Sequence, residues 1–129
     1  AGAAPGHESI GAAIRAANAA GRPAIVGFMT AGFPKKETFT QDLAKVASAA
    51  DVVEIGIPFT DPMADGMTIQ RASRGALAQG VTLPWILESL RTMTPRAQAP
   101  LLLMSYLNPL LAYGLDRLPR AAREAARGV

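Results

Sequence analysis

"DVVEIGIPFTDPMADG", residues 51–66, places one carboxylate, Glu54, inside an apolar run and follows it with two Asp-containing turns. The run has the length and the β-branched composition of a buried strand. Successive side chains of a strand point to opposite faces, so Glu54 shares one face with small neighbours. The other face carries the bulky residues, which we expect to pack on helices: Val53, Ile55 and Ile57.

Two further apolar runs resemble strands that are covered on both faces. One lies before the quoted stretch and the other after it, so that three strands are expected near residues 24–30, 52–57 and 100–106. In the segments between these strands, apolar residues recur at helical spacing. The expected helices are a first one in "ESIGAAIRAANAAGRP" capped by Ser9, one through Phe39, Leu43, Val46 and Ala50, one from Thr68 to Gly80, one capped by Thr82 with Leu83, Ile86, Leu87 and Leu90 inward, and a last one starting near Leu118.

Strands that alternate with helices predict parallel strands joined by right-handed crossovers. The fold class is therefore α/β, with a helix followed by three strand–helix units. Three parallel strands would leave two edges unpaired, whereas a closed eight-stranded barrel takes about 250 residues. We expect residues 1–129 to form a single incomplete domain, the N-terminal part of a (β/α)₈ TIM barrel, with the inner faces of its strands exposed.

Composition excludes several classes of protein. Half of the 129 residues are hydrophobic and 18% are charged, which is typical of a globular chain. There are no cysteines and one histidine, so we expect neither disulfides nor a metal site, and cysteine usage is compatible with the cytoplasm. No apolar run reaches the length of a membrane span. The basic residues Arg117, Arg120, Arg123 and Arg127 have helical spacing without interleaved aromatics, which favours a solvated helix face over nucleic-acid binding.

The carboxylates of the quoted stretch are candidates for acid–base chemistry. In a barrel Glu54 would point inward near the carboxyl end of its strand, where the active sites of such barrels lie. A partly buried carboxyl group without a partner is suited to exchange a proton. A structural Glu bonded to a backbone amide or a basic side chain is the alternative. Asp61 and Asp65 lie in the following loop, where each could instead only stabilise its own turn.

Three segments closely resemble the tryptophan synthase alpha chain family: "FMTAGFP", "VVEIGIPFTDPMADGMTIQRASRGALAQGVT" and "LLLMSYLNPLLAYG". The resemblance covers residues from about 25 to 114. It implies a (β/α)₈ barrel lyase that cleaves indole-3-glycerol phosphate to indole and glyceraldehyde 3-phosphate by a retro-aldol step. It also implies a partner beta chain in an α2β2 assembly, which joins indole to serine.

By position in the motif, the resemblance assigns roles to individual residues. Glu54 falls on the general acid/base, and Asp65 falls on the acid that stabilises the indole nitrogen. Phe28 and Tyr106 fall on the indole pocket, although both could be core aromatics. The rim residues that would face the beta chain are Pro58, Asp61 and Asn108. The resemblance implies no cofactor in this chain, because the pyridoxal phosphate belongs to the beta chain.

The loops that bind the substrate phosphate in this family, and the loop that closes its site, come later in the family's chain than residue 129. We therefore expect the 129-residue piece alone to be inactive. Two alternatives stay open. One is a truncated, catalytically silent module that docks on the beta chain. The other is a different phosphate-binding barrel lyase or isomerase, against which the "PFTDPMADG" loop argues.

Overall fold

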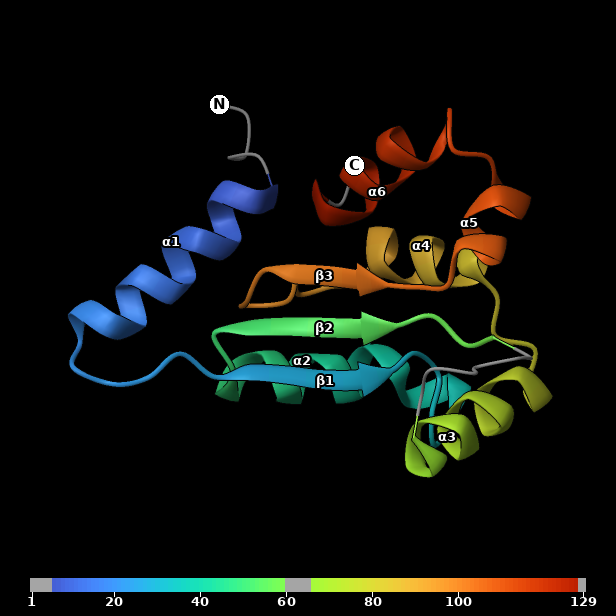
Figure 1. Ribbon diagram of the computed structural model, residues 1–129, viewed down its shortest axis with the longest axis horizontal. Helices are drawn as coiled ribbons and strands as arrows, with labels where there is room; N and C mark the ends of the chain where they lie inside the picture. The colour runs from blue at the N-terminus through green and yellow to red at the C-terminus, as the bar shows by residue number, and fades with distance from the viewer. Residues whose placement is uncertain (1–5, 60–65, 128–129) are drawn as a thin grey trace.

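Three parallel strands form one sheet in the computed structural model, which describes residues 6–59 and 66–127. The helices over residues 39–49 and 83–92 pack behind the sheet, and the three strands all point the same way (Figure 1). The elements in chain order are α1 (Gly6–Ala19), β1 (Val26–Thr30), the short 3₁₀ helix η1 (Lys36–Thr38), α2 (Phe39–Ala49), β2 (Val52–Gly56), α3 (Met67–Ala78), α4 (Leu83–Thr92), β3 (Leu101–Met104), α5 (Leu107–Tyr113) and α6 (Leu118–Arg127).

The predicted parallel order is confirmed. The strands lie in the order β1-β2-β3, with Phe28 opposite Glu54 and Glu54 opposite Leu102. β1 and β3 are shorter than expected, beginning at Val26 and ending at Met104. β3 ends early because Tyr106 has left the sheet to become the residue before the first turn of α5.

The hydrophobic core lies between the sheet and the helices. Val53 and Ile55 are fully buried on the helix-covered face, where Phe39 and Leu43 of α2 pack. All four inward residues predicted for α4 are buried: Leu83, Ile86, Leu87 and Leu90. Each fully buried aliphatic side chain of this kind contributes about 1.5–3 kcal/mol to folding, so this face stabilises the layer.

Helix ends follow the sequence signals in part. The hydroxyl group of Thr82 accepts a hydrogen bond from the backbone N–H of Trp85 at 3.3 Å, as expected for an N-cap. Gly80 has φ of +81° and ends α3, where the Val81 N–H bonds back to the Ala76 carbonyl. The prediction that Ser9 caps the first helix is wrong, because α1 begins at Gly6 and Ser9 lies inside it.

A single glutamine ties the loop after β1 to the end of α3. The Gln79 Oε1 accepts the Lys36 backbone N–H at 2.8 Å, and its Nε2 donates to the Pro34 carbonyl at 2.8 Å. Weaker contacts of Nε2 reach the carbonyls of Gly32 and Gly75 at 3.3 and 3.2 Å. The amide oxygen and the amide nitrogen of Gln79 therefore both hold this rim loop in place.

Gly32 is required at the start of the same loop. Its φ is +80°, and a Cβ there would lie 2.3 Å from a methyl carbon of Val81. Only glycine avoids both the strain of a positive φ and the clash with Val81. Glycine is therefore required where this loop turns over the end of α3.

An ion pair closes the opposite, amino-terminal end of the sheet. The Asp51 carboxylate accepts two hydrogen bonds from the Arg22 guanidinium, at 2.8 and 2.9 Å, and one from the Ile25 N–H at 2.7 Å. The Arg22 guanidinium and then the Ile25 amide lower the pKa of Asp51 to about 2. This pair fixes the approach of α1 to β1 and lies away from the strands' carboxyl ends.

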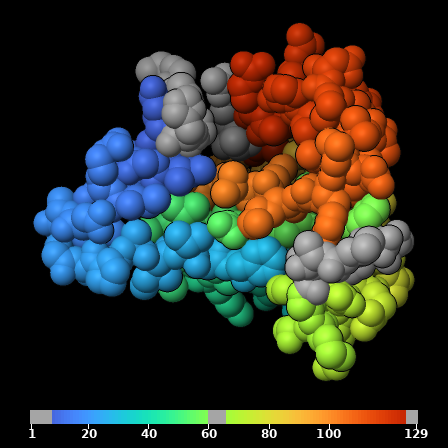
Figure 2. Space-filling view, in the orientation of Figure 1, coloured from blue at the N-terminus to red at the C-terminus, as the bar shows by residue number. Residues whose placement is uncertain are grey.

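The sheet face that points away from the helices is open, as expected for the inside of an incomplete barrel. Figure 2 shows this face, with side chains of the strands at the surface between α1 and α3. Its exposed apolar residues are Val26 (49%), Phe28 (42%), Leu102 (39%) and Met104 (45%). Within the described residues, β1 and β3 each pair on one side only.

Candidate active site

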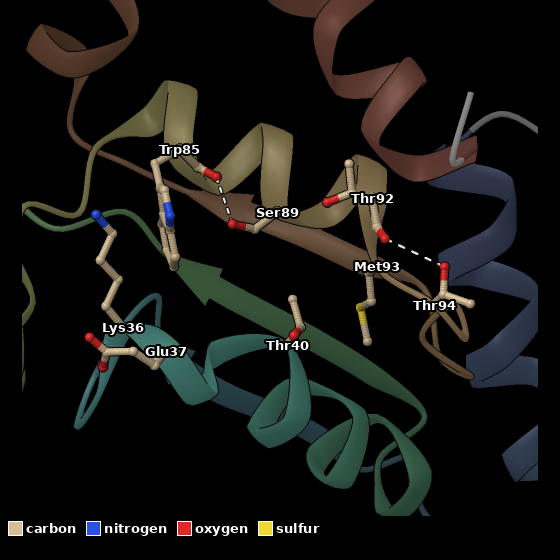
Figure 3. A pocket seen from close by; sticks show the side chains of 8 residues that line it. All are labelled: Lys36, Glu37, Thr40, Trp85, Ser89, Thr92, Met93 and Thr94. Atoms are coloured by element: carbon tan, nitrogen blue, oxygen red, sulfur yellow. Dashed lines mark hydrogen bonds between the residues drawn. The ribbon is translucent and has the colours of Figure 1, made fainter.

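Two hollows are candidates for a site, and their positions distinguish them. The larger, about 640 Å³, lies between η1, α2 and α4 on the helical side (Figure 3). The Lys36 ammonium lies 5.1 Å from the centre of the Trp85 ring there, and the Phe39 and Trp85 ring centres lie 5.5 Å apart. The wall of this outer groove is thus made of contacts that hold two helices together, and we do not place the chemistry in it.

The smaller hollow, about 180 Å³, lies at the carboxyl ends of the strands. In parallel α/β folds this is the end where ligands bind. β1, β2, β3 and α3 all contribute to its wall: Phe28, Thr30, Gly56, Ile57, Ile69, Ser73, Met104, Ser105 and Tyr106. We call this the rim cavity.

Glu54 lies on the open face beside this cavity, as predicted. It is partly buried and sits in register between Phe28 and Leu102, while its neighbours Val53 and Ile55 point into the core. No hydrogen bond or ion pair joins its carboxylate to another side chain or backbone group in the described part of the chain. The alternative of a structural Glu held by an amide or a basic residue therefore finds no partner there.

Gly56 makes room for the aromatic wall of the cavity. A Cβ at Gly56 would lie 2.8 Å from Cζ of Phe28, so the Phe28 ring extends across the neighbouring strand. Glu54 and Gly56 share a face, and the ring of Phe28 consequently lies next to both. The strand alternation that exposes Glu54 also places this ring over the sheet.

Tyr106 joins Phe28 in the wall of the rim cavity, as the sequence predicts. Its ring stacks on Phe59, with ring centres 5.4 Å apart and planes inclined by 27°. Ser105 next to it donates its hydroxyl to the Tyr106 carbonyl at 2.7 Å. The turn from β3 into α5 is therefore fixed by local contacts, and it brings an aromatic ring to the strand ends.

The remaining predicted site residues lie around this rim or outside the described residues. Pro58 is buried two residues after the end of β2, and Asn108 is exposed in the first turn of α5. Asp61 and Asp65 lie outside the described residues, so the structure does not test whether Asp65 approaches Glu54.

Thr30 and Ser73 are cavity residues that the sequence analysis did not single out. They are the buried polar residues of the described chain, with 6% and 4% of their surfaces exposed. The sequence positions of both residues could have indicated that they lie in the cavity wall. Thr30 follows Phe28 by two residues in a strand, and Ser73 follows Ile69 by four in a helix, so each shares a face with another lining residue.

Among the described residues, no group of three or more His, Cys, Asp or Glu side chains could hold a metal ion. None of the helices in residues 6–59 and 66–127 has the length and hydropathy needed to cross a membrane. Three of the four basic residues predicted to form a solvated face, Arg117, Arg120 and Arg123, are exposed on or beside α6.

Parallel strands, crossover helices and an open sheet face that carries a carboxylate define an α/β barrel-type chain. Comparison with known proteins agrees with this class. The family model for the tryptophan synthase alpha chain matches residues 14–129, and the chain belongs to that family.

The relatives give the extent of the match. The chain is 50% identical over 113 residues to the tryptophan synthase alpha chain of Nitratidesulfovibrio vulgaris and 52% identical over 116 residues to that of Desulfovibrio desulfuricans. These alignments cover 87% and 89% of this chain but 44% of each relative, so the chain spans less than half of their length.

Solved structures give the same result. Tryptophan synthase subunit alpha from Legionella pneumophila superposes with a TM-score of 0.83 at 37% identity, over 92% of this chain and 46% of that one. Tryptophan synthase from M. tuberculosis in its aminoacrylate-bound form gives a TM-score of 0.82 at 30% identity, over 91% and 48%. The described strands and helices therefore have the arrangement of the corresponding part of a TIM barrel.

Proposed function

We propose that the protein carrying this chain is a lyase that cleaves indole-3-glycerol phosphate to indole and glyceraldehyde 3-phosphate in tryptophan biosynthesis. One observation carries the proposal beyond family membership: Glu54 stands without a described partner on the open sheet face, between the Phe28 ring and Leu102. A carboxyl group in that place can reach a ligand that lies over the strand ends.

The reaction breaks the carbon–carbon bond between the indole ring and the first glycerol carbon. In its protonated form, Glu54 first gives a proton to the ring carbon that bears the glycerol chain, which places positive charge on the indole nitrogen. Asp65 is assigned to stabilise that charge. As a carboxylate, Glu54 then takes the proton of the hydroxyl group on the first glycerol carbon. The carbon–carbon bond breaks, its electron pair returns to the ring and neutralises the nitrogen, and the carbon leaves as the aldehyde of glyceraldehyde 3-phosphate.

The aromatic residues of the rim cavity suit the indole ring of this substrate. Phe28 and Tyr106 supply flat apolar surfaces beside Glu54, and Ile69 of α3 closes one side. The cavity wall carries no charged side chain among its described residues. The substrate phosphate is therefore assigned to groups outside the described residues.

We also propose a beta chain partner in an α2β2 assembly, which would hold pyridoxal phosphate while this chain holds no cofactor. The rim residues Pro58, Asp61 and Asn108 are assigned to that contact. A cytoplasmic location fits this biosynthetic role.

The test is Glu54→Gln in the complete gene product, with indole release from indole-3-glycerol phosphate as the readout. The variant keeps the shape of the side chain but can neither take nor return a proton. We expect its rate to fall well below a tenth of the wild-type rate while the circular dichroism spectrum stays unchanged.

A Glu54→Gln variant that keeps a tenth or more of the rate would exclude the acid–base role. If the wild-type protein releases no indole but still binds a tryptophan synthase beta chain, the silent docking module is the correct description instead.

A further inference from the structure

Two hydroxyl groups in the rim cavity make no hydrogen bond to the residues that the structure describes. Thr30 is 94% buried and Ser73 is 96% buried (exposed fractions 6% and 4%), and both line the cavity. Neither hydroxyl group makes a hydrogen bond in the described part of the chain. Neither hydroxyl oxygen is a fully buried atom without a partner, so both remain accessible from the cavity.

A serine elsewhere in the chain shows what Ser73 does differently. Ser89 of α4 donates its hydroxyl to the carbonyl four residues earlier, that of Trp85, at 2.8 Å. Ser73 occupies the same kind of position inside α3 but makes no such bond to its own helix. Its hydroxyl group thus stays available to the cavity, as does that of Thr30 on the adjoining strand.

The chemistry of the wall indicates which ligand group fits there. The lining residues carry no charge, so an anion such as a phosphate would find no compensating group. A hydroxyl group both donates and accepts, and a pair of hydroxyls can therefore satisfy a third one in either direction. The group that best fits this position is a neutral hydroxyl.

Register gives the position of the pair relative to Glu54. Thr30 pairs with Gly56, two residues nearer the rim than the pair of Phe28 and Glu54, which is about 7 Å along the strands. A ligand that reacts beside Glu54 would extend toward this pair with the part of its side chain that lies next to the reacting carbon.

We propose that Thr30 and Ser73 form a hydrogen-bonding subsite for the glycerol hydroxyl group that does not react, the one on the second glycerol carbon. This inference rests on the proposed function, since it takes indole-3-glycerol phosphate as the ligand. The subsite positions the glycerol chain so that the reacting hydroxyl faces Glu54.

The test uses two analogues that cannot be cleaved to an aldehyde, with binding measured by titration calorimetry on the complete gene product. One analogue lacks only the reacting hydroxyl, and the other lacks both glycerol hydroxyls. Their affinity ratio isolates the non-reacting hydroxyl. We expect the wild-type protein to prefer the first analogue about three- to tenfold, as one hydrogen bond gives.

Thr30→Val and Ser73→Ala each remove one hydroxyl at nearly constant volume, from different elements. We expect the preference to fall to below about twofold in each, while Thr30→Ser retains it. Ser89→Ala is the matched control, because it removes a helical serine hydroxyl outside the cavity and should leave the ratio unchanged.

Variants that keep the wild-type ratio would overturn the subsite, and so would variants that lose affinity equally for both analogues, because that result indicates a role in cavity shape. A wild-type protein that releases indole but binds both analogues equally also excludes the subsite while leaving the proposed function standing. A wild-type protein that neither releases indole nor binds either analogue refutes the proposed function itself.

Discussion

Replacing Gln79 by alanine should cost the fold more than any ordinary substitution of a polar residue at a helix end. The side chain makes two good hydrogen bonds of 2.8 Å, to the Lys36 N–H and the Pro34 carbonyl, and two weaker ones to Gly32 and Gly75. At about 1 kcal/mol for each good bond and less for the longer ones, the loss is about 2–3 kcal/mol. The Lys36 N–H, part-buried, would then lack its partner.

Urea unfolding of the complete gene product, followed by far-ultraviolet circular dichroism, measures this loss as a shift of the midpoint at unchanged slope. Gln41→Ala is the control, since Gln41 is an exposed residue of α2 and makes no hydrogen bond in the described chain. We expect the control to stay within about 0.5 kcal/mol of the wild type.

A Gln79→Ala variant as stable as the Gln41→Ala control would refute the reasoning. It would show that water replaces the amide at no net cost, and that the loop after β1 is held by its other contacts alone. Gln79→Glu gives a second check, because it keeps the acceptor for Lys36 but loses the donors to Pro34 and Gly32. Its stability should fall between those of the wild type and Gln79→Ala, or below both if the new charge repels the carbonyls.

Gly32→Ala should destabilise by about 2–4 kcal/mol, because the new side chain meets both a positive φ and a valine methyl. Gly66→Ala, where a Cβ would meet no atom of the described residues within 4 Å, is the comparison in the same denaturant assay. Asp51→Asn should lower stability at neutral pH, and the difference from the wild type should shrink as the pH falls from 4 toward and below 2. Arg22 lowers the pKa of Asp51 to about 2 in the folded protein, so the contribution of Asp51 to stability is complete above its ordinary pKa of 3.8 and is lost as the pH falls through 2. Parallel pH–stability curves for the two proteins would contradict this. Asp65→Asn should reduce indole release by ~10²-fold or more, and unchanged turnover would assign Asp65 to its turn alone.

The strands, their order and the face of Glu54 were predictable from the sequence because a parallel strand has only local requirements. Alternation by two fixes that Glu54 points away from Val53 and Ile55, whatever the rest of the chain does. The inward residues of α4 and the Thr82 cap were predictable for the same reason. Helical period and capping chemistry act within one or two turns.

The missed elements depend on the chain at a distance or are very short. α5 has seven residues, and its Pro109 is tolerated only because the first turn of a helix leaves its N–H groups free. Its period is too short to detect. Ser9 resembled a cap, but the α-helical turn continues to Gly6 before it. The hydrogen bonds of Gln79 join segments 43 to 47 residues apart, and no local pattern indicates them.

A residue of the candidate site was predictable only where the family motif and the alternation of side chains along a strand indicate the same position. Phe28 and Glu54 pair in register on the open sheet face, and Phe28 and Tyr106 line the rim cavity. The burial of Thr30 and Ser73 depends on α3 lying against β1, which is a tertiary contact. The roles of Asp61 and Asp65, the contact of Pro58 and Asn108 with a partner, and the extent of the domain stay predictions.

The place of Trp85 decides what an optical experiment on this protein would report. It is the only tryptophan of the chain, and it lies in the outer groove in contact with the Lys36 ammonium and the Phe39 ring, not in the rim cavity. The fluorescence of Trp85 would change when η1 and α2 separate from α4. It would change little when a ligand binds at the strand ends. Since an indole ligand is itself a fluorophore, the two signals have separate origins. A quencher that reaches the outer groove, such as iodide, would then reduce the fluorescence of Trp85 but not the fluorescence of a ligand bound against Phe28.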